Sequence, residues 1–257
     1  MKIIWTLVIA LLCIGTTASA QSVDPTTAVF RLQVLDAQLQ PDGFFHGHGY
    51  GTGFFIAADG TALTASHVVY TVVHDPGKYR LLAIVGQEMF DANVVCASKL
   101  PYDPSNPKSI TILSRDVAEI RLAPSTMPEG HRRNFIRTPS GEQIVLATAH
   151  TDSEMPTFPF LTIGGQADGQ VTVVGFGGIS AIPSEWTATG RVVGTGTAQD
   201  GTPIFNVDSS NPPVPGDSGA PVLGPQGTVV GLWAWHSLVN PRLSTAEDGS
   251  VLQKPCP

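Results

Sequence analysis

The sequence predicts an all-β protein built from many short strands. Glycine and proline account for 27 and 21 of its 257 residues and are scattered along the chain, as turns between short strands require. Hydrophobic residues make up 42% and charged residues 14%, which supports a sizeable core and argues against disorder. No long helical periodicity appears beyond the first twenty residues.

Those first twenty residues are expected to be removed before the protein folds. Lys2 gives a positive start, residues 3–14 form an almost unbroken apolar run, and small residues precede a cut after Ala20. This order is typical of a secretory signal peptide, residues 1–20. A membrane anchor is the alternative, but the run is short for a span and no later segment resembles one. We therefore expect a secreted or periplasmic protein without a membrane span once the signal is removed.

Charge argues against a nucleic-acid partner. The formal net charge is −7, and loss of Lys2 makes it more negative by one. Nucleic-acid binding usually needs a basic patch, whereas the most basic cluster, residues 131–133 with Arg137, is small and is interpreted as a solvated loop. No nucleic-acid partner is therefore expected, and the expected state is a monomer.

Two cysteines, Cys96 and Cys256, remain after signal removal. An even number of cysteines in an exported protein favours a disulfide, which would tie the end of the chain to its first half. The alternative is two free thiols.

The first half of the chain alternates strands with turns. A strand is predicted over residues 29–35, and a hairpin over residues 51–64, whose Asp59-Gly60 turn is a strong hairpin signal. The hairpin delivers His67 at its end. A lone histidine after a strand is more often structural than catalytic, but the tight hairpin and the small residues beside His67 fit a side chain placed for use. His46 and His48 could bind a metal, but loop histidines are common and only Asp42 lies near them, so no metal is expected.

Short apolar runs continue at residues 81–85 and 92–96, and a strand follows Asp116 over residues 116–122. Asp116 could simply end a turn, or it could be a buried acid that orients a histidine. Residues 123–160 are punctuated by prolines and predict a connection in which only residues 143–149 look like a strand. Further strands are predicted in the second half of the chain, at residues 171–177, 191–198, 204–207, 222–223 and 229–235.

A serine between an acid and a glycine stands at residues 215–222. The glycines allow a sharp turn and would free the amides of Gly216 and Ser218 to serve as an oxyanion hole. The same residue types are also ordinary turn formers, so the stretch alone does not decide between the two readings.

Three stretches taken in order resemble the motifs of the chymotrypsin-fold, trypsin-like serine proteases. Residues 63–69 are similar to the histidine motif of that family, residues 116–122 to its aspartate motif, and residues 216–222 to its serine motif. The similarity covers roughly residues 45–236, and the style is that of bacterial secreted or periplasmic members.

The resemblance implies two antiparallel β-barrels with the active site between them. The first barrel, over residues 21–150, would carry His67 and Asp116, and the second, over residues 151–257, would carry Ser218. The implied function is a serine endopeptidase with a Ser-His-Asp triad, an acyl-enzyme and no cofactor, and the implied partner is a protein or peptide substrate. The alternatives are a catalytically silent binding protein of the same fold and a regulated periplasmic protease that needs a separate partner.

The sequence departs from the family pattern in ways that bear on activation and specificity. The family's activation sequence is missing, so the partner of Asp217 is open and the Gln21 amine of the mature chain is one candidate. Ala234 stands where a serine often supports the catalytic aspartate. With no acid at Pro212, the pocket favours a small or apolar residue of the substrate. Its expected lining is Pro212, Pro213, Val214, Pro215, Ala234, Trp235 and His236.

Overall fold

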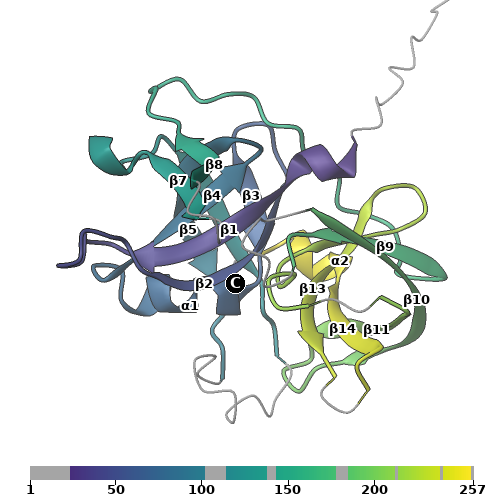
Figure 1. The fold of residues 1–257 in the computed structure, drawn as a ribbon. Helices are drawn as coiled ribbons and strands as arrows, with labels where there is room; N and C mark the ends of the chain where they lie inside the picture. The colour runs from purple at the N-terminus through teal and green to yellow at the C-terminus, as the bar shows by residue number, and fades with distance from the viewer. Residues whose placement is uncertain are drawn as a thin grey trace, which may run out of the picture.

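Two β-barrels lie side by side in the computed structural model, as Figure 1 shows. It describes residues 24–101, 114–137, 143–177, 185–211, 214–237 and 240–255, without the side chains of residues 134–137, 143–146 and 236. Both barrels have six antiparallel strands. The predicted fold of two antiparallel β-barrels is confirmed. The proposed signal peptide, residues 1–20, lies outside the described residues.

The first barrel follows a short 3-10 helix, η1 (Pro25–Ala28). Around the barrel the strands run in the order β4-β1-β2-β3-β6-β5, and pairing of β5 with β4 closes it. Alternate residues of β6, Ala118, Ile120 and Leu122, are buried, as the sequence pattern predicted. The strands are β1 (Val29–Asp36), β2 (Gly47–Phe55), β3 (Thr61–Thr64), β4 (Tyr79–Val85), β5 (Glu88–Ala97) and β6 (Ala118–Ala123).

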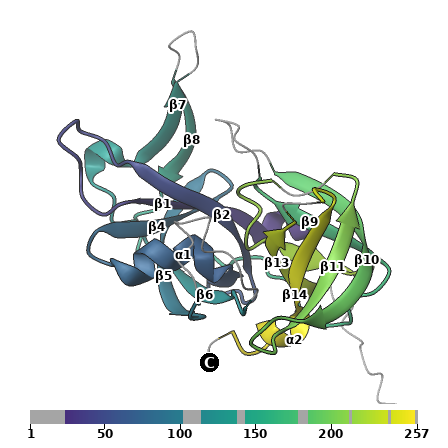
Figure 2. The same cartoon turned by 90° about the horizontal axis from the view of Figure 1, so that it is seen from below.

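A hairpin lies outside this barrel, and only its second strand, residues 143–149, was predicted. It consists of β7 (Arg133–Arg137) and β8 (Gln143–Ala149), and it joins β5 through a short parallel pairing of β8 (Figure 2). The basic cluster interpreted as a loop therefore belongs to the 3-10 helix η3 (Glu129–His131) and to β7. That prediction was wrong because pairing with β8, which the local sequence does not reveal, makes the segment a strand. Beneath the hairpin lies an apolar cluster: Leu35, Leu82, Ile84, Met89, Met127 and Ala147.

The second barrel is closed by strands in the order β10-β11-β14-β13-β12-β9. The last strand, β14, was not predicted, because its polar sequence shows no apolar alternation even though Ser244, Ala246 and Glu247 are buried. A single turn of helix, α2 (Gly249–Leu252), follows it. The strands are β9 (Gln170–Gly175), β10 (Trp186–Thr197), β11 (Pro203–Ser209), β12 (Pro221–Leu223), β13 (Val229–His236) and β14 (Leu243–Asp248).

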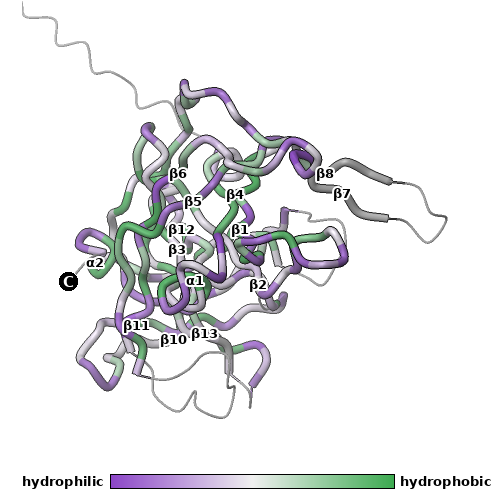
Figure 3. The backbone as a smooth tube through the Cα atoms, turned by 90° about the vertical axis from the view of Figure 1, so that its left-hand side faces the viewer, coloured by the Kyte–Doolittle hydropathy of each residue, from purple (hydrophilic) through white to green (hydrophobic). Residues whose placement is uncertain are grey.

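Apolar side chains join the two barrels. Figure 3 shows apolar stretches along the strands and polar stretches in many of the connections. The largest buried cluster fills the first barrel around Phe30, Phe54 and Phe55 and continues into Leu232 and Leu252 of the second half. A separate cluster around Phe205 and Trp233 fills the second barrel. The shared cluster fixes the two barrels against each other, as a site between them requires.

One helix interrupts the first barrel between β3 and β4. Helix α1 (Ser66–His74) begins just after the predicted hairpin and carries His67 in its first turn. Within the described part of the chain, no helix is long and apolar enough to cross a membrane.

Candidate active site

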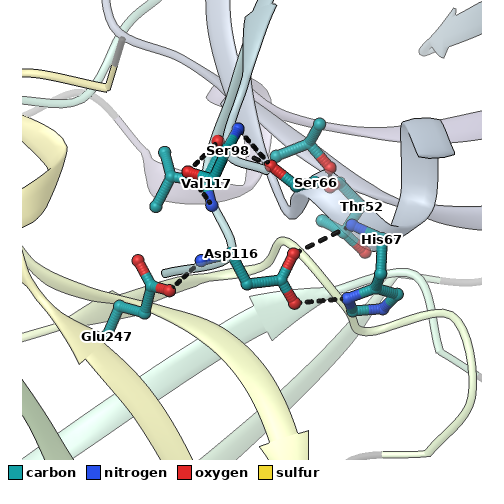
Figure 4. Close-up of polar contacts among 8 residues, drawn as sticks. Thr52, Ser66, His67, Ser98, Asp116, Val117 and Glu247 are labelled. Carbon is teal, nitrogen blue, oxygen red and sulfur yellow. Dashed lines mark hydrogen bonds and ion pairs between the residues drawn. The ribbon is translucent and has the colours of Figure 1, made fainter. Parts of the chain in front are cut away.

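His67 is held by the carboxylate of Asp116, a residue that lies two positions before the start of β6 (Figure 4). The backbone N–H of His67 donates to Oδ1 of Asp116 at 2.8 Å, and Nδ1 of the ring lies 2.6 Å from Oδ2. A carboxylate can only accept, so Nδ1 carries the proton and Nε2 has a free lone pair. Asp116 is fully buried, whereas the His67 side chain keeps 24% of its surface exposed. The ring is therefore oriented from behind and open in front.

The start of helix α1 explains why these two residues meet. The first N–H groups of a helix have no partner within it, and the N-cap residue, Ala65, has no side chain to supply one. Asp116 takes this place, since its carbonyl oxygen accepts from Ser66 N–H at 3.1 Å and its carboxylate accepts from His67. The requirement for a helix cap thus fixes the backbone of His67 as well as its ring.

Two buried serines tie this corner together. The hydroxyl of Ser66 donates to the carbonyl oxygen of Val117 at 2.7 Å and accepts the N–H of Ser98 at 2.9 Å. Ser98 Oγ lies 3.0 Å from the same carbonyl oxygen. Sequence reasoning missed both residues, because a serine in a strand or helix gives no local signal of a distant partner.

The environment of His67 acts on its pKa in two opposing directions. Burial of the ring lowers the pKa, but the negative charge of Asp116 and its hydrogen bond raise it, and the net pKa lies above the ordinary value of 6.5. Asp116 therefore favours the charged imidazolium, the form that a base reaches after taking a proton.

A second buried acid lies behind Asp116. Glu247 of β14 has no exposed surface, and its Oε1 accepts the backbone N–H of Asp116. Burial and the charge of Asp116 raise the pKa of Glu247 to about 9, against the opposing effect of that N–H. Glu247 was not anticipated from the sequence, because the strand that carries it was not predicted and its polar residues give no signal of burial.

On the serine side, glycines fix the path of the backbone. Gly216 and Gly219 have φ angles of +104° and +89°, a region that side chains rarely adopt. A Cβ atom at Gly219 would overlap the carbonyl oxygen of Thr52 and lie 2.8 Å from the backbone nitrogen of Ala65. Only glycine lets the loop come this close to the residues that precede His67.

Thr52 of β2 holds the same loop from the first barrel. Its backbone N–H donates to the carbonyl oxygen of Ser218 at 2.9 Å, and its hydroxyl donates to the carbonyl oxygen of Gly216 at 2.8 Å. The hydroxyl also accepts the N–H of Phe176, at the end of β9, at 3.0 Å. Thr52 is a further residue that sequence reasoning missed, although it lies within the predicted hairpin.

The two amides predicted as an oxyanion hole remain available. Among the described residues, neither Gly216 N–H nor Ser218 N–H donates a hydrogen bond. Both residues line one hollow of about 330 Å³. They are therefore free to donate to a group bound there.

The structure brings the segment of Ser218 to the corner that holds His67. A Cβ atom at Gly51 would overlap the side chain of Val68, which follows His67, and would lie 3.1 Å from the carbonyl oxygen of Ser218. Within the described ranges, no hydrogen bond joins Ser218 to the ring of His67, and catalytic hydrogen bonds commonly tighten only when substrate binds.

The carboxyl group of Asp217 is fully buried beneath the same loop. Its Oδ2 accepts the N–H of Val214 at 2.8 Å, and a Cβ atom at Gly177 would overlap the carboxyl group. Burial raises the pKa of Asp217 to about 6, although the backbone N–H groups of Val214 and Gly177 oppose the shift. No cation pairs with it in the described part of the chain, and Gln21 lies outside that part, so its partner stays an open prediction.

The hollow beside Ser218 contains four of the residues expected for the substrate pocket: Val214, Pro215, Ala234 and Trp235. Gly49, Tyr50 and Trp233, which were not among the expected lining residues, also line it. Pro212, Pro213 and the side chain of His236 lie outside the described residues. Its described lining has no charged side chain, and Ala234 is nearly buried, so the wall is apolar and partly aromatic.

The two histidines considered as metal ligands each have their own carboxylate. His46 Nε2 lies 2.7 Å from Asp42, and His48 Nε2 lies 2.6 Å from Asp36. Among the described residues, no three histidine, cysteine, aspartate or glutamate side chains are grouped as metal ligands would be. Cys256 lies outside the described residues, so its pairing with Cys96 stays a prediction.

Comparison with known proteins places this geometry in a family. No curated protein sequence matches the chain. The fold resembles the crystal structure of the active form of the Rv3671c protease from M. tuberculosis, with a TM-score of 0.53 and 17% sequence identity over 90% of this chain and 80% of that one. The profile of the trypsin-like peptidase domain matches residues 51–232, from the Gly51-Thr52-Gly53 strand to β13. The chain belongs to the trypsin-like peptidase family.

Proposed function

We propose that this protein is an exported serine endopeptidase in which Ser218 is the nucleophile, His67 the base and Asp116 the residue that orients His67. The observation that carries the proposal is the double hold of Asp116 on His67, which leaves Nε2 unbonded at the corner where the Ser218 loop lies. This arrangement of carboxylate, imidazole and hydroxyl activates a serine that is otherwise a weak nucleophile.

The first half of the reaction forms an acyl-enzyme. Nε2 of His67 takes the proton of Ser218 Oγ as that oxygen attacks the carbonyl carbon of the peptide bond. The electron pair moves to the carbonyl oxygen, and the N–H groups of Gly216 and Ser218 stabilise the resulting oxyanion, each donor contributing about 3 kcal/mol. His67 then gives the proton to the leaving amine as the C–N bond breaks.

The second half releases the acyl group. A water molecule attacks the ester carbon while His67 takes one of its protons. The ester C–O bond breaks, and the proton passes to Ser218 Oγ, which restores the starting state. Asp116 stays ionised and stabilises the imidazolium in both halves.

A fluorophosphonate probe tests the proposal on the mature protein. We expect labelling at Ser218 in the wild type, no labelling of Ser218→Ala, and a loss of peptide hydrolysis of about four orders of magnitude in that variant. Thermal unfolding of both proteins controls for folding. A folded wild type that neither takes the probe nor hydrolyses peptides would favour a binding protein, whereas a Ser218→Ala variant that hydrolyses peptides normally would show that Ser218 is not the nucleophile.

The pocket supports a preference for a small or apolar substrate residue before the cleaved bond. Its described lining is uncharged and includes the tryptophans Trp233 and Trp235. A peptide library should be cleaved mainly after such residues, and cleavage mainly after arginine or glutamate would refute this.

Export and the disulfide are parts of the same proposal. The signal-like residues 1–20 support export, which amino-terminal sequencing of the mature protein would test by a start at Gln21. Cys96 lies opposite Glu119 in the pairing of β5 with β6, and Glu119 lines one hollow together with Pro255, the last described residue, which supports the proposed pairing of Cys96 with Cys256. Two alkylatable thiols in the native protein would rule out the disulfide.

A further inference from the structure

Glu247 is a buried side chain next to the proposed triad that the reaction described above does not use. It belongs to the second barrel, yet its Oε1 accepts the backbone N–H of Asp116, which belongs to the first (Figure 4). Its Oε2 is buried and has no hydrogen-bond partner among the described residues. Burial of a carboxyl group with one orphaned oxygen is costly, so its position calls for an explanation.

We propose that Glu247 is a positioning residue for Asp116, acting from the opposite barrel and so fixing the carboxylate that orients His67. The proposal rests on the proteolytic function proposed above. The Asp116 backbone is held on both sides, because Glu247 accepts its N–H and Ser66 N–H donates to its carbonyl oxygen. With both peptide groups fixed, the side chain of Asp116 has a defined place from which to reach His67.

The neighbouring residue shows that the second barrel holds this whole segment. The N–H of Arg115 donates to Oδ2 of Asp200, in the turn between β10 and β11, at 2.7 Å. The guanidinium group of Arg115 donates to the carbonyl oxygens of Val251 at 3.3 Å and of Lys254. Asp116 thus sits at the end of a clamp built from the second barrel, while its carboxylate works on a histidine of the first.

The charge state of Glu247 suits this role. Burial and the charge of Asp116 raise its pKa to about 9, opposed by the N–H of Asp116 and by Arg115, while Asp200 adds to the increase. Glu247 is therefore neutral at pH 7 to 8 and can accept the N–H without setting a second negative charge against Asp116. An ionised Glu247 would repel the carboxylate that it holds.

Two variants of similar size separate positioning from packing. Glu247→Gln keeps a neutral oxygen that can accept the N–H of Asp116, and we expect its kcat to stay within about twofold of the wild type, as the loss of charge changes nothing at neutral pH. Glu247→Leu keeps the volume but removes the acceptor. We expect its kcat to fall by about tenfold to a hundredfold with KM unchanged, since small misplacements of catalytic groups cost this much.

The pH profile adds a measurement that a merely structural role would not change. In Glu247→Leu the pKa of His67, read from the acid limb of kcat/KM, should move down, because a misplaced Asp116 stabilises the imidazolium less. In the wild type kcat/KM should also fall as pH rises through about 9, the pKa of Glu247, and this fall should be absent in Glu247→Gln. This comparison uses the wild type and the mildest variant, so it decides the question even if Glu247→Leu does not fold.

The outcomes separate this proposal from the one on which it rests. If the wild type is labelled at Ser218 while both variants keep its kcat and its full pH profile, positioning by Glu247 is overturned and proteolysis stands. If the wild type is not labelled, proteolysis fails. In that case the low-field NMR signal of the His67 Nδ1 proton still tests positioning, which predicts a shifted or broadened signal in Glu247→Leu and an unchanged one in Glu247→Gln.

Discussion

The two sides of the candidate active site are held by different means. Around His67 the chain is held by side-chain oxygens, because those of Asp116 and Ser66 form hydrogen bonds with backbone groups of neighbouring segments. Around Ser218 the loop is held mainly through its backbone, by glycines at positive φ and by carbonyl oxygens that accept hydrogen bonds from Thr52. The histidine side should therefore be sensitive to the loss of a functional group, and the serine side to the addition of a single methyl group.

The largest expected effect is on the histidine side. Asp116→Asn keeps the shape but lets the ring of His67 adopt the wrong tautomer, and we expect a loss of kcat of about four orders of magnitude. His67 must be neutral to act as a base, so the wild-type acid limb of kcat/KM should lie above pH 6.5 and move down in this variant. An acid limb unchanged by Asp116→Asn in a pH titration would contradict the proposed coupling.

On the serine side the strongest test adds one methyl group. In Gly219→Ala the new Cβ would overlap Thr52 and crowd Ala65, so the Ser218 loop must move away from His67. We expect kcat/KM to fall by at least about a hundredfold. Gly227→Ala is the matched control, because Gly227 has a φ of +75° but open space around it. Equal losses in the two variants would mean that backbone strain, and not the contact with the first barrel, sets the effect.

Thr52 holds the serine side through a side-chain hydroxyl, so removal of that hydroxyl should have an intermediate effect on activity. Thr52→Val removes the hydroxyl that links Gly216 to Phe176 and leaves both backbone groups without their partner. We expect kcat to fall about tenfold and the melting temperature to drop. Thr52→Ser keeps the hydroxyl and should restore most of both. If valine and serine behave alike in kinetics and thermal unfolding, the hydroxyl does not hold the loop.

The smallest expected effect concerns stability and not catalysis: the free energy of unfolding should depend on pH through Glu247. Between its ordinary pKa of 4.5 and its folded-state pKa of about 9, Glu247 is protonated in the folded protein and ionised in the unfolded one. The unfolded state then binds fewer protons, so the free energy of unfolding falls as pH rises, by up to about 1.4 kcal/mol per pH unit from this group. In urea titrations, the free energy of unfolding of Glu247→Gln relative to that of the wild type should be higher at pH 8 than at pH 6. A constant difference between the two would contradict a buried, protonated Glu247.

Sequence patterns predicted the structure best where the signal is local, as in turns and alternating strands. The Asp59-Gly60 turn, with Gly60 at a φ of +86°, fixed the hairpin that leads to His67, and alternation in β6 placed the strand after Asp116. These predictions succeed because turns and alternation depend on neighbours in the sequence. The approach of Asp116 to His67, 49 positions apart, was implied instead by the resemblance to a known family, and the contact is present at 2.6 Å.

What sequence reasoning missed depends on partners far along the chain. Helix α1 is capped by Asp116 and not by its own N-cap residue, so no local start signal exists. Strand β14 and its Glu247 are polar in sequence and become buried only when the second barrel closes against the first. The link from Thr52 to Gly216 spans 164 positions, a separation at which periodicity carries no information.

The hydrogen bonds from Arg115 to the carbonyl oxygens of Val251 and Lys254 have a consequence for residues outside the active site. Residues 251–254 thus support, from behind, the segment that leads into Asp116. An exopeptidase that trims the chain past Lys254, or a bulky carboxy-terminal tag that pries this stretch away, would slow turnover without touching a residue that meets the scissile bond.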